Sequence, residues 1–460
     1  MQVLINGALR WADSILIGWR RPRYGRARHS TILKLFALCA ILCGCSSLRP
    51  PEISQSGAVS PFQPGPEFEI IGGFAHGNAA VTDAVGRIHV IAMLTRPAGL
   101  HHLVIGPQGV ESRELISTTV AGFSSVMAAF DHAGRLHVVN GTHHFVLDAG
   151  WWQGPKEGSA CADLVLVAED LVCAFEIQGE KVGTAGRWDW FGIPSMFTPP
   201  IPFPWYVRSR KGVIAREAPS GASTWTVIER DERLDIEWMV LSADNHGMTH
   251  VLYSQSRDRF GLMHVKVGYA RIAAPNIPIY PANSEALLPA HSVASISGQV
   301  VNVRPTGGEG DGVALAADPE TGDALGLVRG LNGDGNAAWF YFLARDGRPG
   351  PPQPFLARGS SAWSGNYIYS NPRLAPAGGG RYHAIITSSN FSSLYYTTFF
   401  DETWSTPVKL GSDAYPGRNS IATDHQGNAL AIWMGPDKKL VGRWILLAPP
   451  DTQFSLKKQK

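Results

Sequence analysis

The amino-acid sequence predicts an all-β fold, and three observations support this prediction. The chain of 460 residues contains 50 glycines, 32 prolines and 14 tryptophans, a composition typical of turns and aromatic strands. No long stretch has the 3.6-residue periodicity of an amphipathic helix. One phrase recurs along the chain: an apolar strand, a turn with Asp and usually Gly, and a second strand that often carries His or Ala.

Each copy of this phrase is predicted to form a β-hairpin. The turn is favoured because Asp caps it with its own side chain and Gly accepts a positive φ angle. The clearest copies contain Asp83, Asp131, Asp244, Asp318 and Asp424. Degenerate copies lie near residues 163–176, 205–217 and 373–387, so the sequence predicts eight candidate units.

A third strand follows most hairpins, as in HHLVIG, HHFVLD, GLMHVKVGYA, AAWFYFLARDG, LYYTTFFDE and KLVGRWILL. A fourth sometimes begins near a Trp-x-x-Pro such as Trp404–Pro407. Three or four strands every roughly 40–50 residues is the spacing of a β-propeller. The sequence therefore predicts a propeller of seven or eight blades over residues 66–448. Tandem β-sandwiches remain the alternative, because they also place strands at regular intervals.

Two segments have predicted places outside this repeat. Phe68–Gly73 (FEIIGG) precedes the first hairpin, and we expect it to form an outer strand that closes the ring with the last blade. The segment 273–310 is rich in Pro, Ser, Ala and Gly and is predicted to be an insertion between blades.

Segments Ser420–Trp433 and Tyr395–Pro407 follow the order strand, Asp/Gly turn, strand and Trp-x-x-Pro. In this they resemble the broad sialidase-like class of bacterial propellers, and the likeness spans most of the mature chain. True sialidases also carry repeated Ser-x-Asp-x-Gly-x-Thr-Trp boxes. Segment 242–250 is one residue longer than that box and lacks its tryptophan, and an Arg-Ile-Pro-like opening is absent. The resemblance thus implies the architecture and not sialidase activity.

Residues 1–44 are predicted to be a secretory signal peptide. Basic residues precede an apolar stretch from Leu35 to Cys43, and the small Gly44 stands directly before Cys45. This stretch is much shorter than the roughly 20 residues of a membrane-spanning helix. Leu42–Cys45 resembles the lipobox of bacterial lipoproteins, which implies that Cys45 becomes the acylated N-terminus. Ser46 stands directly after the cysteine, as in lipoproteins that are sorted to the outer membrane, and the resemblance therefore implies that location.

These features predict a protein of the bacterial cell envelope, anchored in the lipid bilayer and facing the periplasm or the surface. Residues 45–65 would form the lipidated N-terminus and a linker, and residues 449–460 a basic tail. Apolar residues make up 44% of the chain, enough for a large core, and charged residues 17%. The formal net charge of +2 argues against a nucleic-acid partner.

Cys161 and Cys173 are the cysteines that remain in the folded domain. In an oxidising periplasm they can form a disulfide. However, a tight hairpin turning near Glu169 and Asp170 would place Cys173 opposite Leu166, and a disulfide tolerates little misplacement. The sequence leaves this pairing open.

Paired histidines and clustered aromatic residues are the main candidates for ligand binding. His101-His102 and His143-His144 stand just beyond loops that join second and third strands, on the face where ligands usually bind. Neighbours along a strand point to opposite faces, so each pair offers at most one ligand to a shared metal. We therefore predict no metal and no cofactor. The weak ligand-binding set comprises Trp151, Trp152, Trp188, Trp190, Trp205, Tyr206, His143 and His144.

The aromatic rings of this set would stack on sugar faces or peptide side chains, or else pack between blades. No complete catalytic motif is visible, and no catalytic residue is assigned. The favoured function is a non-catalytic binding module for a glycan or an envelope protein. The alternative is a polysaccharide-degrading enzyme, a hydrolase or a lyase. In a lyase, His143 or His144 would act as the base, with Tyr206 or Arg208 as the charge neutraliser.

Overall fold

The computed structural model describes residues 58–448, apart from 96–97, 121–125, 132, 158–162, 168–169, 185–205, 218–222, 229–234, 257–263, 274–293, 297–298, 301–312, 332–336, 356–371, 388–392, 413–418 and 436. The chain divides into two compact units, Met1–Pro51 and Glu52–Lys460, and all described residues belong to the second. Among them there is no helix long and apolar enough to span a bilayer.

Strand pairing arranges the described strands in seven sheets, of which six are antiparallel throughout. Two of these six carry four consecutive strands each. The first consists of β2 (Ala75–Thr82), β3 (Ile88–Thr95), β4 (Ala98–Gly106) and β5 (Gly109–Ser117). The second consists of β6 (Val126–Phe130), β7 (Leu136–Asn140), β8 (His143–Asp148) and β9 (Trp151–Glu157).

Three further antiparallel sheets begin with the same three-strand meander and add short outer strands. One has β14 (Asp235–Ala243), β15 (Met248–Ser256), β16 (His264–Ala273) and β18 (Gln299–Val300). The next has β19 (Ala314–Ala317), β20 (Ala324–Leu331), β21 (Ala337–Arg345), β22 (Arg348–Pro349) and β23 (Gln353–Pro354). The third has β24 (Arg373–Gly378), β25 (Arg381–Thr387), β26 (Ser393–Phe400), β27 (Thr403–Trp404) and β28 (Val408–Ser412).

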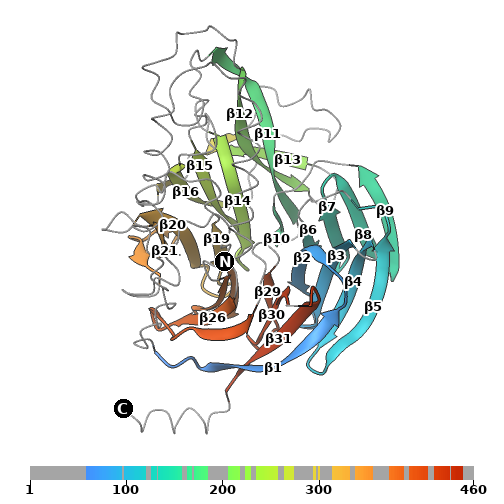
Figure 1. Ribbon diagram of the computed structural model, residues 1–460. Coiled ribbons are helices and arrows are strands. Elements are labelled where there is room, and N and C mark those ends of the chain that lie inside the picture. Colours follow the sequence, from blue (N-terminus) through green and yellow to red (C-terminus); the bar gives the residue numbers. More distant parts are fainter. Residues whose placement is uncertain are drawn as a thin grey trace, which may run out of the picture. The chain divides into compact units, whose positions relative to one another are not determined.

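The sixth antiparallel sheet joins the two ends of the described chain. It consists of β29 (Ser420–Thr423), β30 (Ala429–Met434), β31 (Leu440–Leu447) and, as its outer strand, β1 (Phe62–Ile71). The pairing of β1 with β31 confirms that the segment around Phe68–Gly73 closes the ring (Figure 1). The strand begins at Phe62, inside the segment expected to be a linker.

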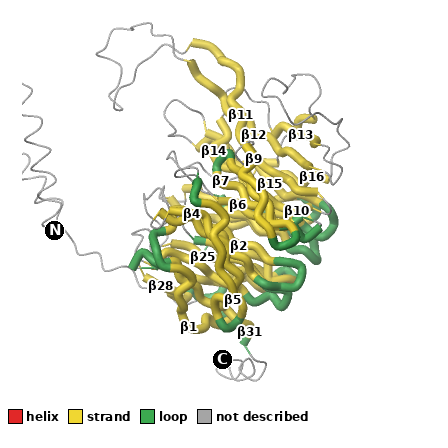
Figure 2. Tube along the Cα trace, turned by 90° about the vertical axis from the view of Figure 1, so that its right-hand side faces the viewer, coloured by secondary structure: helices red, strands yellow, loops and turns green. Residues whose placement is uncertain are grey.

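The remaining sheet departs from the blade design. It holds β10 (Asp163–Val167), β11 (Asp170–Thr184), β12 (Tyr206–Glu217), β13 (Ser223–Ile228) and β17 (Ala294–Ile296), and its last pair is parallel. Strands β11 and β12 reach beyond the other strands (Figures 1 and 2). Residues 205–217, predicted as a hairpin, instead lie largely in the single strand β12.

The fold is an all-β propeller, as predicted, and the tandem-sandwich alternative is wrong. The first strands of successive sheets contact one another in a closed cycle, in the order β2, β6, β10, β14, β19, β24, β29 and back to β2. Six blades are regular, where the sequence predicted seven or eight, and the irregular sheet lies between β6 and β14. The strands β17 and β18 come from the predicted insertion 273–310 and pair at the edges of two sheets.

Each regular blade buries both of its faces, because it packs between two neighbours. In β3, Val90, Ala92 and Leu94 pack toward the blade of β29 to β31, whereas Ile91 and Met93 pack toward the blade of β6 to β9. This alternation follows from the two-residue period of a strand. Within one blade, packing is tight enough to require glycine at Gly326, where a Cβ atom would lie 2.3 Å from the side-chain ring of its cross-strand partner Phe342.

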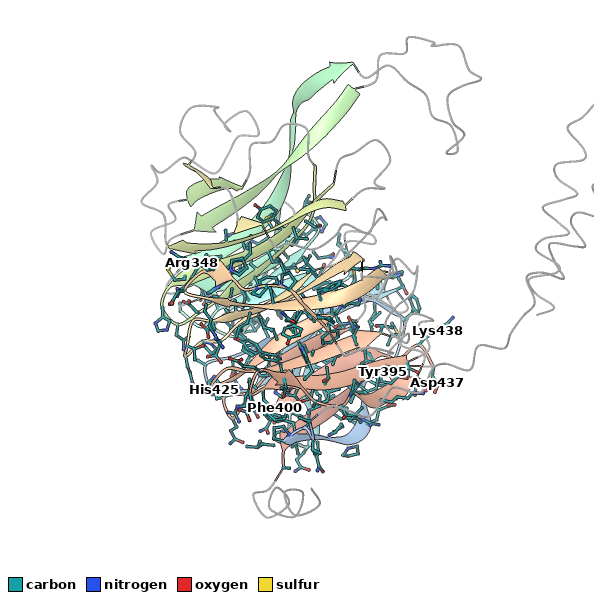
Figure 3. All side chains as sticks on the ribbon, turned by 90° about the vertical axis from the view of Figure 1, so that its left-hand side faces the viewer. Arg348, Tyr395, Phe400, His425, Asp437 and Lys438 are labelled. Atoms are coloured by element: carbon teal, nitrogen blue, oxygen red, sulfur yellow. The ribbon has the colours of Figure 1, made fainter. Side chains whose placement is uncertain are left out.

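The propeller has two distinct ends, which we call the turn face and the loop face. The turn face carries the Asp/Gly turns between first and second strands, and the loop face carries the connections between second and third strands. Figure 3 shows both: His425 and Arg348 belong to turns on the first, and Asp437 and Lys438 belong to the β30–β31 connection on the second. The hairpins with Asp83, Asp131, Asp244, Asp318 and Asp424 all turn at the turn face, as predicted.

Candidate functional site

The aspartate of each turn does more than cap the turn. Asp83 Oδ1 accepts hydrogen bonds from the backbone N–H groups of Val85 and Arg87, at 3.0 and 2.8 Å. Its Oδ2 contacts Arg87 Nε at 2.8 Å and His89 Nε2 at 3.1 Å. The same Asp–His contact, six residues apart, recurs between Asp131 and His137 and between Asp244 and His250, at 3.0 Å each.

Each of these histidines makes a second hydrogen bond, to a side chain of the third strand. His89 Nδ1 lies 2.8 Å from His102 Nε2, and His102 Nδ1 bonds in turn to Glu114. The corresponding pairs in two other blades are His137 with His144, at 3.0 Å, and His250 with the Tyr269 hydroxyl, at 2.7 Å. The recurring histidine of the sequence phrase is therefore the middle of a buried Asp–His–His or Asp–His–Tyr network.

A related network crosses between blades. The Nε2 atom of His383 donates to the Gly427 carbonyl of the next blade at 2.8 Å. Its Nδ1 atom consequently accepts the hydrogen bond from the Tyr396 hydroxyl, at 2.7 Å. His383 and Tyr396 are fully buried. Because the aspartates and middle histidines of these networks make their hydrogen bonds within the protein, we interpret them as structural links rather than as a catalytic centre.

The electrostatics of the networks agree with this structural role. Burial acts to raise the pKa of Asp244, but hydrogen bonds from His250, the Met248 N–H and Arg271 outweigh it, so the pKa lies below its usual value. Burial lowers the pKa of His250, against the raising effect of Asp244. An ionised Asp244 thus faces a neutral His250 at neutral pH.

These buried histidines predict that the protein loses stability in mild acid. Burial lowers the pKa of His144 and of His383 to about 4, from an unfolded value near 6.5. Each therefore binds a proton on unfolding below pH 6.5, so stability is complete above that pH and falls between pH 6.5 and 4. For each such histidine, the free energy of unfolding changes by at most about 1.4 kcal/mol per pH unit in this range.

Urea unfolding at several pH values between 7 and 4 measures this slope. We expect His144→Gln to have a shallower pH dependence than the parent chain, and Gln426→Ala, at an exposed turn position without a titratable side chain, to retain the parent slope. Parallel stability curves for the parent chain and His144→Gln would refute this assignment.

The loop face holds a different set of polar side chains, near the ends of second strands. We call Ser254, Arg329, Arg373, Thr387 and Asn419 the loop-face polar group. Ser254, Arg329 and Thr387 lie toward the ends of β15, β20 and β25, and all three are buried. They come from three consecutive blades.

Contacts between blades connect part of this group. Asn419, just before β29, donates from Nδ2 to the Thr387 hydroxyl at 3.4 Å. Its backbone carbonyl accepts a hydrogen bond from Arg373 Nε at 3.3 Å. Two buried polar atoms, Asn419 Oδ1 and Ser254 Oγ, have no hydrogen-bond partner among the described residues.

The chemistry of the loop-face polar group suits a polar ligand. Hydroxyl, amide and guanidinium groups offer both donors and acceptors, and no member is a carboxylate or a histidine that would act as a general base. Sequence reasoning singled out the loops of this face but missed these five residues. They lie at the loop-face ends of strands in neighbouring blades. An alignment of the hairpin repeats with one another would have placed them at this end.

The structure separates the aromatic and histidine candidates predicted from the sequence. Trp151 begins β9 at the turn-face end and is 78% exposed, whereas His143 and His144 begin β8 at the loop-face end. Trp152 is half-buried and meets the His102 ring edge-on at 5.5 Å, between two blades. Trp152 therefore packs between blades, which is the second of the two alternatives for the aromatic set. Trp188, Trp190 and Trp205 lie outside the described residues, as does the side chain of Tyr206.

The two histidine pairs do not converge. His102 and His144 belong to networks in different blades. His101 faces the other side of its strand and is buried, and neither of its ring nitrogens has a hydrogen-bond partner among the residues that the structure describes. Within the described part of the chain, no group of three metal-ligating side chains gathers. Cys173 lies opposite Leu164 rather than Leu166, and Cys161 and Cys45 fall outside the described residues.

No known protein family matches the sequence, and no curated protein is similar to it. Several solved structures are similar to this chain at low sequence identity. A protein of unknown function from Dyadobacter fermentans has a TM-score of 0.44 and 9% identity over 85% of this chain and 100% of its own. The α-L-arabinanase of Penicillium chrysogenum has a TM-score of 0.41 and 10% identity, over 84% of this chain and 98% of its own. The six-bladed Aleuria aurantia lectin has a TM-score of 0.40 and 10% identity, over 83% of this chain and 99% of its own.

Proposed function

We propose that this protein is a lipid-anchored β-propeller of the bacterial envelope that binds a glycan through its loop face and does not catalyse a reaction. The loop-face polar group is the observation that supports the proposal. Its hydroxyl, amide and guanidinium groups match the many hydroxyls of a saccharide, and two of its polar atoms lack a partner among the described residues. The turn face, in contrast, uses its aspartates and histidines in internal networks.

The way in which His144 is held supports a non-catalytic role. The lyase form of the enzyme alternative would use His143 or His144 as a base, with Tyr206 or Arg208 as its partner. His144 Nε2 already lies 3.0 Å from His137 Nδ1 in a buried network, and its pKa of about 4 makes it a weak base. Anchoring through Cys45 is supported by the lipobox Leu42–Cys45.

A glycan array with the chain from residue 46 onward tests this proposal. We expect binding to a defined glycan class without released products, as checked by mass spectrometry. Asn419→Ala is expected to weaken binding about tenfold, which corresponds to the loss of roughly 1.4 kcal/mol. Gln426→Ala on the turn face serves as the matched control and should bind like the parent chain.

Three results would count against the proposal. Released oligosaccharides would establish the enzyme alternative, and equal affinities of Asn419→Ala and the parent chain would remove the loop-face polar group from the site. Failure to bind any glycan would favour an envelope protein as the ligand. Thermal unfolding of each variant confirms that a loss of binding does not reflect unfolding.

A further inference from the structure

The hydrogen-bonded network of the first blade, β2 to β5, has a carboxylate at both of its ends. Asp83 Oδ2 lies 3.1 Å from His89 Nε2, and His89 Nδ1 lies 2.8 Å from His102 Nε2. His102 Nδ1 then lies 2.5 Å from Glu114 Oε1. Three links thus join four side chains, from the inner turn to the outer strand β5. We call these four residues the first-blade chain.

The first-blade chain has fewer protons than links when its carboxylates are ionised and its histidines are neutral. An ionised carboxylate only accepts hydrogen bonds, and a neutral imidazole carries one N–H group and one acceptor nitrogen. Two neutral histidines therefore supply two protons for three links, whichever tautomers they adopt. One link always lacks a proton, and two acceptor atoms face each other there. A third proton completes all three links.

The second blade, β6 to β9, provides an internal comparison without this deficit. Its network joins Asp131 to His137 and His137 to His144, both at 3.0 Å. Two neutral histidines supply the two protons that these two links need. On the outer strand, Lys156 lies opposite His144, at the position where the first blade has Glu114. An ammonium group donates hydrogen bonds and does not accept them, so it requires no proton from the imidazole.

A proton can reach the first-blade chain from solvent at its outer end. The side chain of His102 is 4% exposed, whereas that of Glu114 is 43% exposed. Among the described residues of the second blade, the uncharged rings of Phe130 and Trp152 pack edge-on against the two histidines, with ring centroids 4.9 and 5.5 Å apart. At the inner end, the Nε atom of Arg87 bonds to the aspartate at 2.8 Å. Proton exchange with solvent therefore occurs through the outer carboxylate.

The charges around the outer histidines of the two blades act in opposite directions. Burial lowers the pKa of His102, and the hydrogen bond and charge of Glu114 offset part of this change. Burial and the charges of His137 and Lys156 together lower the pKa of His144 to about 4. The first-blade chain is therefore expected to bind a proton at a higher pH than the second blade does.

We propose that the first-blade chain is a pH-sensitive switch, which takes up one proton in mild acid and thereby completes the hydrogen bonds between the inner turn and β5. The proton enters at the exposed carboxylate and is shared by Glu114 and His102, which titrate as a pair. Above the pH of uptake one link is open, and below it all three are closed. The second blade has no open link to close, so acid gives it no new hydrogen bond.

Nitrogen-15 NMR of the full chain with labelled histidine rings tests the switch. We expect His102, whose resonances are assigned by their loss in His102→Gln, to titrate at a higher pH than His144. Glu114→Gln places an amide N–H opposite the ring, which completes the third link without an added proton. In this variant the titration of His102 should move down by about 1–3 pH units. Glu111→Gln removes the same charge from an exposed position of the same strand, outside the first-blade chain, and should leave the titration unchanged.

Urea unfolding tests the same point without assigned resonances. Between pH 6.5 and 5, Glu114→Gln should take up as much as one additional proton on unfolding, because its folded state no longer binds the third proton. Its stability should therefore fall more steeply with acid than that of the parent chain or of Glu111→Gln. Equal slopes, or a His102 that titrates identically in the parent chain and Glu114→Gln, would overturn the proposal. A His102 that is already charged at pH 8 would overturn it as well, because the third proton would then be permanent.

Discussion

Replacing Asp244 by alanine is expected to lower the free energy of unfolding by about 3–5 kcal/mol, because it leaves a buried charge network without its centre. Asp244 is buried and accepts hydrogen bonds from the backbone N–H groups of His246 and Met248, at 2.8 and 3.0 Å. Its Oδ2 also lies 3.0 Å from His250 Nε2 and 2.9 Å from Arg271 Nη2. Both side chains lose their anionic partner together.

The chain contains a matched control for this effect. Asp424 caps the equivalent turn, with Oδ1 accepting the N–H groups of Gln426 and Asn428 at 2.9 and 2.8 Å. Its blade has Leu430 at the position where the blades of Asp83, Asp131 and Asp244 carry the network histidine. Asp424→Ala should therefore cost only about 1–2 kcal/mol. Urea unfolding compares the two variants, and equal losses would show that the network adds nothing beyond the cap.

Removal of residues 46–71 is expected to abolish cooperative folding. This deletion takes away β1, which buries Phe62, Ile70 and Ile71. Burial of one such side chain contributes about 1.5–3 kcal/mol, so three are comparable with the net stability of about 5–15 kcal/mol of a typical domain. The deletion also exposes the backbone edge of β31, which then pairs with other chains.

A shorter deletion separates ring closure from loss of the preceding segment. Removal of residues 46–57 leaves Ala58 and all of β1 in place, and the unfolding temperature should stay within a degree or two of the parent value. Thermal unfolding and size-exclusion chromatography measure both deletions. A monomeric, cooperatively unfolding chain without residues 46–71 would show that β1 is dispensable.

Local patterns were sufficient to predict most of the fold. The Asp/Gly turns at Asp83, Asp131, Asp244, Asp318 and Asp424 depend on the conformations of four or five adjacent residues, and all five form as expected. The closing strand was predictable because an apolar strand before the first hairpin has one free place in a ring, beside the last blade. These predictions depend on backbone chemistry that short segments carry by themselves.

One local pattern was misleading. Gly212 lies within 205–217 and indicated a turn, but β12 runs through it. The residue pairs with Glu176 on one side and Ile228 on the other, and these two neighbours hold the glycine extended. The irregular sheet that results explains why the number of regular blades was overestimated. A glycine alone does not distinguish a turn from a strand that has partners on both edges.

The hairpins and the closing strand could be predicted because each is encoded in contiguous residues, and the expected location in the envelope likewise depends on one short segment. Which polar side chains meet became visible in the folded chain alone. Thr387 and Asn419 are 32 residues apart, and Ser420 bonds to Asn78 across 342 residues. Such contacts depend on the order of blades around a closed ring, which sets distances that no local pattern records. The loop-face polar group exists for that reason, as does the meeting of Pro61 and Ala448 at the rim.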